Sequence, residues 1–271
     1  MRYGIIAGNG RFPILALEAA RIQGDEVVAI GIEGEASKEI EALAARTYWI
    51  SIAALTKLIG ILKDEKITEI LFCGQVKHVS IFSALRPDWR LAKLLLSLKR
   101  KNTDSLLGGV IQILEDEGIQ VADSTRLLKP MLAGVGTLTK RQPTEDEAED
   151  IAYGRQVADA LSGFDVGQAV AIAERACVAV EAMEGTDEML RRAAALTKGR
   201  RDLRLIKAAR RRKHLQFDVP VVGPETIAVM RETKTTALAI TAGRTLLLDR
   251  DLMLKLANDA KITIVGYAAE D

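Results

Sequence analysis

The sequence predicts an α/β protein, with a Rossmann-like N-terminal domain built on a parallel sheet and a smaller mixed α/β C-terminal domain. In the first half, short apolar runs alternate with amphipathic segments of helical length, which is the pattern of βαβ units. In the middle, KPMLAGVGTLTKRQPTE at 129–145 is rich in Gly, Pro and Thr, as connections between domains are. We therefore expect domains at residues 1–132 and 137–271.

Each element of the first domain follows from its residue pattern. Continuous apolar runs, typical of buried parallel strands, predict strands at 3–8, 26–32, 69–74 and 119–123. Apolar residues at helical spacing predict helices at 14–24, 55–66 and 103–118.

The second domain mixes shorter elements. Thr144 and Glu147 form a capping-box pattern for a helix that starts there. Two strands follow with a charged turn between them, and a helix begins near Asp187. Further apolar runs predict strands at 219–222, 237–241, 245–248 and 262–267, and a helix at 251–261.

Composition excludes several classes of function. The formal net charge is +1 and aromatic residues make up 4% of the chain, which disfavours nucleic-acid binding. The two cysteines form no CxxC pair, so we expect buried structural thiols rather than a disulfide framework or a zinc site. With no export signal or membrane-spanning stretch recognisable, we expect a cytoplasmic protein.

Two glycine-containing loops follow predicted strands and are candidate ligand contacts. In GNGR, formed by Gly8, Asn9, Gly10 and Arg11, glycines let backbone N–H groups approach a phosphate at a helix N-terminus. Pro13 replaces the small residue of the dinucleotide fingerprint, which disfavours NAD.

The second loop, CGQVKH at 73–78, places Gly74 and Lys77 over the carboxyl edge of the sheet, where such folds bind ligands. A plain loop with a solvated lysine explains the same pattern equally well.

The stretch VEAMEGTDEML at 180–190 places Glu181, Glu184 and Asp187 around a tight turn. Three carboxylates favour a hard cation such as Mg²⁺ or Mn²⁺. The alternative is that Thr186 and Asp187 cap a helix while Glu184 is solvated; capping leaves unexplained a carboxylate at the end of an apolar strand.

The stretch RRRKHLQFDVPVVGPET at 210–226 leads from a basic run to Asp218, at the start of a strand and beside a helix that begins at Pro224. A carboxylate there would be ionised and able to orient water or bind a metal. The alternative is a solvated basic face next to a buried strand.

Taken together, GNGRFP, the GxVK loop, the spacing of Lys101 and Asp104, VEAMEGTDEMLRRA and FDVPVVGPET resemble one family along the whole chain. It is the LpxI-type UDP-2,3-diacylglucosamine pyrophosphatases of bacterial lipid A synthesis. The resemblance implies magnesium-dependent hydrolysis to UMP and 2,3-diacylglucosamine 1-phosphate (lipid X). It implies an essential Asp218, with Glu184 and Asp187 as the next functional positions.

The resemblance is not complete. His214 and Gln216 stand where the family commonly has an acid and an arginine, so the substrate follows less securely than the family. The expected site combines Asp218 and the metal with Lys77 and Lys207, which would stabilise developing charge. Gly8, Asn9, Gly10, Arg11, Gly74 and Asp104 would bind the substrate.

The expected partner is a UDP-linked diacylated glucosamine lipid. The segment PDWRLAKLLLSLKRK at 87–101 would line an acyl-chain site or rest on the inner membrane, or else form a core helix with snorkelling lysines. The sequence leaves the oligomeric state open, and a homodimer is the assembly that many such two-domain enzymes form. The alternative function is a Rossmann-type protein that binds a nucleotide or dinucleotide and acts on another nucleotide-linked substrate.

Overall fold

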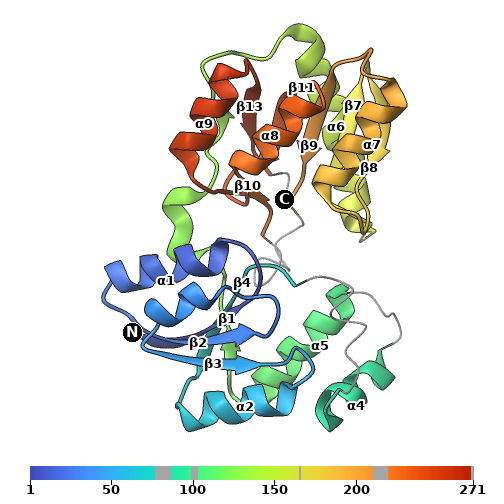
Figure 1. Ribbon diagram of the computed structural model, residues 1–271. Helices are drawn as coiled ribbons and strands as arrows, with labels where there is room; N and C mark the ends of the chain where they lie inside the picture. The colour runs from blue at the N-terminus through green and yellow to red at the C-terminus, as the bar shows by residue number, and fades with distance from the viewer. Residues whose placement is uncertain (77–86, 99–102, 165, 210–218, 270–271) are drawn as a thin grey trace. The chain divides into compact units, whose positions relative to one another are not determined.

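The computed structural model describes residues 1–76, 87–98, 103–164, 166–209 and 219–269. The chain divides into two compact units, Met1–Leu128 and Lys129–Asp271, which Figure 1 shows. The predicted α/β class is confirmed, although the C-terminal unit is the longer of the two rather than the smaller.

The N-terminal unit contains one parallel sheet with the strand order β3-β2-β1-β4-β5. The strands are β1 (Arg2–Ala7), β2 (Glu26–Ile32), β3 (Arg46–Ile50), β4 (Glu69–Cys73) and β5 (Gln120–Val121). The order reverses between β1 and β4, and ligands of such folds bind outside the carboxyl ends of the strands at that point. The edge strand β3 was not predicted, because only Ile50 in it is buried and its polar residues hide the pattern.

Helices cover both faces of this sheet, with α1 on one face and α2 on the other (Figure 1). They are α1 (Phe12–Ile22), η1 (Lys38–Ala42), α2 (Leu55–Asp64), α4 (Trp89–Ser97), α5 (Thr103–Asp116) and η2 (Arg126–Met131). In α2 the buried residues are Leu55, Leu58, Ile59 and Leu62, the spacing that places side chains on one face of a helix. Among the described residues, no helix is both long and apolar enough to cross a membrane.

The C-terminal unit is built on a six-stranded sheet with the order β6-β13-β11-β9-β7-β8. The strands are β6 (Gly136–Thr137), β7 (Ala169–Ala173), β8 (Ala176–Val180), β9 (Leu203–Lys207), β11 (Thr235–Thr241) and β13 (Thr263–Tyr267). β9, β11 and β13 are parallel, and β6 and β7 join this core antiparallel. A separate parallel pair is formed by β10 (Val221–Val222) and β12 (Leu246–Leu247).

Alternate residues of the buried strands serve two cores. In β7, Ala169, Ala171 and Ala173 belong to one cluster and Val170 and Ile172 to the other, as the two-residue period of a strand requires. Three helices cover the face of the sheet that carries Ala169, Ala171 and Ala173, and α6 covers the face that carries Val170 and Ile172 (Figure 1). These helices are α6 (Glu145–Gly163), α7 (Thr186–Thr197), α8 (Pro224–Glu232) and α9 (Arg250–Asp259).

Two local predictions can be checked at side-chain level. The capping box of α6 is confirmed, because the Thr144 amide donates to Glu147 Oε2 at 3.0 Å and the Glu147 amide donates to Thr144 Oγ1 at 3.3 Å. The expectation of two buried thiols is half wrong. Cys73 is buried, but Cys177 is exposed because it lies on β8, an edge strand of the sheet.

Candidate functional site

The ammonium group of Lys207 joins three segments of the C-terminal unit. Lys207 is the last residue of β9, and its Nζ donates to Thr186 Oγ1 at 3.1 Å and to the carbonyl of Val221 at 3.3 Å. The Thr186 hydroxyl in turn donates to Glu181 Oε1 at 2.9 Å. This Lys207–Thr186–Glu181 network therefore connects β9, the turn before α7 and β10, the strand that follows Asp218 in the sequence.

The turn before α7 is held open by a glycine rather than by a capping side chain. Gly185 is the N-cap residue, with φ 85° and ψ 166°, and no side chain caps the helix there. Thr186 and Asp187 are already inside the first turn, so the alternative interpretation, in which they are the capping residues of α7, is wrong. The Thr186 hydroxyl is instead used for the bridge to Lys207, while Asp187 lies where a carboxylate interacts favourably with the positive end of a helix.

Two residues before β7 fix the position of Glu181. The Gln168 amide donates to Glu181 Oε2 at 3.3 Å. A Cβ atom at Gly167 would lie 2.0 Å from the Glu181 carbonyl oxygen, so only glycine allows this close approach. Sequence reasoning missed both residues, although a glycine beside a strand is a recognised sign of close backbone packing.

Glu184 is engaged within its own turn. Its Oε2 accepts from the Ala182 amide at 3.0 Å and its Oε1 accepts from Arg192 at 2.6 Å. Its own backbone amide, followed by Arg192, lowers the pKa of the Glu184 carboxyl. Glu184 is therefore ionised at neutral pH and paired with Arg192.

In the N-terminal unit, the loops after β1 and β4 are paired through their backbones. The Asn9 amide donates to the Gln75 carbonyl at 2.6 Å, and the Gln75 amide donates back to the Asn9 carbonyl at 3.1 Å. A Cβ atom at Gly8 would lie 2.5 Å from the Gln75 oxygen, and one at Gly74 would lie 2.5 Å from the Asn9 oxygen. The two glycines thus permit this Asn9–Gln75 pairing, which lies where the strand order reverses.

The amides that the sequence predicts as phosphate contacts are engaged in hydrogen bonds within these two loops. The Gly8 amide donates to the Cys73 carbonyl at 2.8 Å, and the Gly10 amide donates to Asn9 Oδ1 at 2.6 Å. Because the Asn9 amide is also engaged, none of these three N–H groups is open to a ligand in this conformation. Arg11 follows as the exposed N-cap residue of α1.

Both halves of the chain match models of the same protein family. The family model of the LpxI N-terminal domain matches residues 2–131, and that of the LpxI C-terminal domain matches residues 134–265. The chain belongs to the LpxI family.

A curated relative agrees with this assignment. The UDP-2,3-diacylglucosamine pyrophosphatase LpxI of Caulobacter vibrioides is 30% identical over 279 residues, covering 100% of this chain and 99% of the relative. Among solved structures, phosphoribosylglycinamide synthetase from Anaerococcus prevotii is 16% identical with a TM-score of 0.28, covering 64% of this chain and 31% of its own. UDP-glucose 4-epimerase from Bifidobacterium longum, in complex with NAD⁺ and UDP, is 12% identical with a TM-score of 0.29, covering 53% and 42%. At such low TM-scores these two likenesses carry no argument.

The three acids predicted as metal ligands of this LpxI chain do not form a metal site by themselves. Across the part of the chain that the structure describes, no group of three His, Cys, Asp or Glu side chains is arranged to hold a metal ion. Glu181 and Glu184 use both of their carboxylate oxygens on protein donors. Magnesium binding stays a prediction, and we assign no step of the reaction to a metal.

Other predicted site residues of the LpxI chain fall outside the described residues. They are Lys77 and Asp218, together with the side chain of Asp104. Of the predicted residues that are described, the structure brings together Lys207 and Glu181 through Thr186. Their roles in the LpxI reaction stay predictions.

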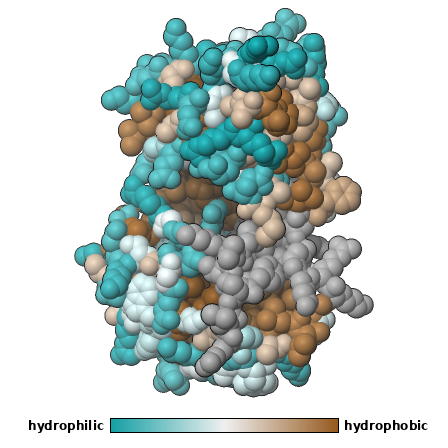
Figure 2. Space-filling model, turned by 45° about the vertical axis from the view of Figure 1, so that its right-hand side comes forward, coloured by the Kyte–Doolittle hydropathy of each residue, from teal (hydrophilic) through white to brown (hydrophobic). Residues whose placement is uncertain are grey.

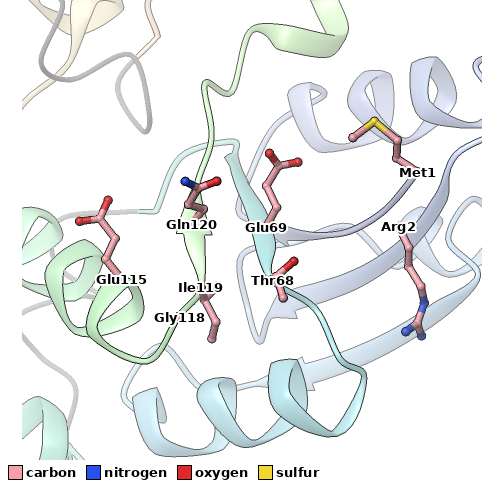
Figure 3. A pocket seen from close by; sticks show the side chains of 8 residues that line it. All are labelled: Met1, Arg2, Thr68, Glu69, Glu115, Gly118, Ile119 and Gln120. Atoms are coloured by element: carbon pink, nitrogen blue, oxygen red, sulfur yellow. The ribbon is translucent and has the colours of Figure 1, made fainter.

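A cavity of about 800 Å³ in the N-terminal unit is lined by other residues than the predicted site residues. Figure 3 shows its lining side chains, which come from the starts of β1, β4 and β5 and from the end of α5. This is the amino edge of the parallel sheet, opposite to the edge where such folds bind ligands. Two of its charged residues are already paired, Glu69 with Arg126 and Arg2 with Glu65. We therefore do not assign the LpxI substrate to this cavity.

Proposed function

We propose that this chain hydrolyses the pyrophosphate bond of UDP-2,3-diacylglucosamine, releasing UMP and 2,3-diacylglucosamine 1-phosphate (lipid X) in lipid A biosynthesis. The observation that carries the proposal is the similarity over the full length of the chain to the Caulobacter vibrioides pyrophosphatase. The match of both LpxI domain models, in order, supports it.

The Lys207–Thr186–Glu181 network supports a role for the C-terminal unit in this reaction. A pyrophosphate gains negative charge at its leaving oxygen as water attacks, and a cation fixed in advance lowers the barrier. Lys207 is fixed by Thr186 Oγ1 and the Val221 carbonyl. We propose that it stabilises this charge, with Lys77 assisting, and that Asp218 orients the attacking water. Glu181 and Thr186 then act as positioning residues.

The experiment that tests the function is the release of UMP from UDP-2,3-diacylglucosamine by the purified full-length chain. We expect release by the wild type and its loss in Asp218→Ala and Asp218→Asn. Asp259→Asn, which changes an exposed carboxylate at the end of α9, is the matched control and should retain activity. A folded wild-type protein that releases no UMP would refute the proposal. His214 and Gln216, where this chain departs from the family pattern, would then be the first positions to examine.

We also propose that the protein works in the cytoplasm at the surface of the inner membrane, because its proposed substrate is a lipid. α4 supports this location. Trp89, Lys93 and Leu96 are exposed and lie at i, i+4 and i+7 on one face of the helix, a pattern typical of interfacial helices. Sedimentation with vesicles containing anionic lipid should be reduced in Trp89→Ser/Leu96→Ser. The proposed homodimer is checked by light scattering.

A further inference from the structure

Two loops of the C-terminal unit lie against each other beside the Lys207–Thr186–Glu181 network. One connects α6 to β7, with residues 164 and 166–168 described, and the other is 181–185, between β8 and α7. The Glu181 amide donates to the Ala169 carbonyl at 2.9 Å, and the Gln168 amide donates to Glu181 Oε2 at 3.3 Å. The backbone of Gly167 touches that of Glu181. Since Ala169 also pairs with Lys207, both loops adjoin residues of the network through their backbones.

Three of these side chains are apolar and exposed. Phe164 is 78% exposed, Met183 is 73% exposed and Val166 is 43% exposed. Single exposed apolar side chains are common, whereas several on adjoining loops indicate a binding surface. Figure 2 brings forward the side on which β8 and α7 lie and shows hydrophobic residues among hydrophilic ones on that face. We refer to Phe164, Val166 and Met183 as the apolar rim.

We propose that the apolar rim binds an acyl chain of the lipid substrate while the pyrophosphate lies at Lys207. This inference rests on the proposed function and assigns residues that determine acyl specificity. In a diacylated sugar linked to a pyrophosphate, the hydrocarbon chains begin only a few bonds from the phosphates. A protein that holds both parts needs an apolar surface next to a cation, and the rim and Lys207 provide this pair.

The charges around the rim select an acyl chain over a bilayer surface. Glu181, Glu184 and Asp187 lie in the adjoining turn, and the cations that contact them are Arg192, through Glu184, and Lys207, through Thr186. Among the described residues of this turn the carboxylates outnumber the cations, so an anionic headgroup beside the rim is disfavoured, whereas the pyrophosphate of the proposed substrate has Lys207 to bind. An uncharged hydrocarbon chain meets no such repulsion and gains from the removal of apolar surface from water.

The test is a series of UDP-2,3-diacylglucosamines of increasing acyl length, each used below its critical micelle concentration. In the wild type, each additional methylene that is buried should raise kcat/KM by roughly fourfold. Phe164→Ser/Met183→Ser should flatten this dependence through a raised KM. The matched control is Leu252→Ser, which removes an exposed leucine on α9 and should retain the wild-type dependence.

Binding of lipid X analogues of the same chain lengths, measured by calorimetry, separates this inference from the proposed function. The wild type could release no UMP but bind longer chains more tightly, with this preference lost in the double variant. That result would support the role of the rim and refute the proposed function. If the double variant keeps the wild-type dependence on chain length, the rim does not bind the acyl chain. Loss of vesicle binding with an unchanged chain-length dependence overturns it in favour of a bilayer contact. A wild type that neither hydrolyses nor binds these lipids overturns both proposals.

Discussion

Replacing Thr186 with valine removes the hydroxyl that bridges Lys207 and Glu181 while nearly preserving the shape of the side chain. The two hydrogen bonds lost measure 3.1 Å to Lys207 Nζ and 2.9 Å to Glu181 Oε1. Lys207 keeps the Val221 carbonyl, and Glu181 keeps the Gln168 amide. All three members of the network are half-buried, so water replaces part of what is lost. We expect a cost of about 1–2 kcal/mol, which is a factor of 5–30 in an equilibrium or rate ratio.

The assay is the measurement of kcat and KM for UMP release. Thr186→Val should lower kcat/KM by roughly 5–30-fold, because Lys207 is no longer held at its position. Thr186→Ser retains the hydroxyl and should stay close to the wild type. Thermal unfolding of both variants confirms that the C-terminal unit remains folded. If Thr186→Val were as active as the wild type within a factor of about two, the network would not position Lys207, and the reasoning would be wrong.

Three further predictions follow from the structure. Gly167→Ala should destabilise the protein by about 1–3 kcal/mol in chemical denaturation, because the added Cβ would lie 2.0 Å from the Glu181 oxygen, while Gly163→Ala, which meets no atom within 4 Å, should not. Hydrogen bonds from Tyr48 and Arg46 lower the pKa of Glu65 to about 2 from the ordinary 4.5, so its contribution to stability is complete above pH 4.5 and is lost as the pH falls towards 2. Glu65→Gln should therefore give a flatter dependence of the unfolding free energy on pH in this range, and equal slopes would contradict this. Chelation of divalent cations should abolish UMP release and added Mg²⁺ should restore it; activity that persists in chelator would end the expectation of a metal.

The sequence predicts local structure well where the determining residues are close together in the chain. The capping box of α6 needs only Thr144 and Glu147, and β1, β2, β4 and β5 of the first unit follow from apolar runs. β9 was missed because its apolar residues lie inside a long basic segment, where charge dominated the pattern. That strand is nevertheless central to the second sheet and ends in Lys207.

The candidate site was only partly predictable for a different reason. Lys207 and Glu181 were expected to be functional, but Thr186 was interpreted as a helix cap because a threonine before a helix usually is one. Its actual contacts are with residues 21 positions later and 5 positions earlier in the chain. Pairings of this kind depend on how the sheet is assembled, and no periodicity in the sequence records them. The same holds for Gly167, whose importance depends on the carbonyl of Glu181.

The Asn9–Gln75 pairing is part of a set of hydrogen bonds that engages the amides predicted to contact phosphate. A phosphate that binds the Gly8, Asn9 and Gly10 amides must displace the Cys73 and Gln75 carbonyls and the Asn9 side chain that accept from them now, so it needs an open form in which these acceptors have moved away. Its apparent affinity is then the intrinsic affinity multiplied by the open fraction. A ligand that engages Gln75 as well as the phosphate-binding amides favours the open form, and a substrate fragment that lacks this second contact binds weakly. If the predicted phosphate contacts hold, the two loops favour a whole substrate over its fragments before any bond is broken.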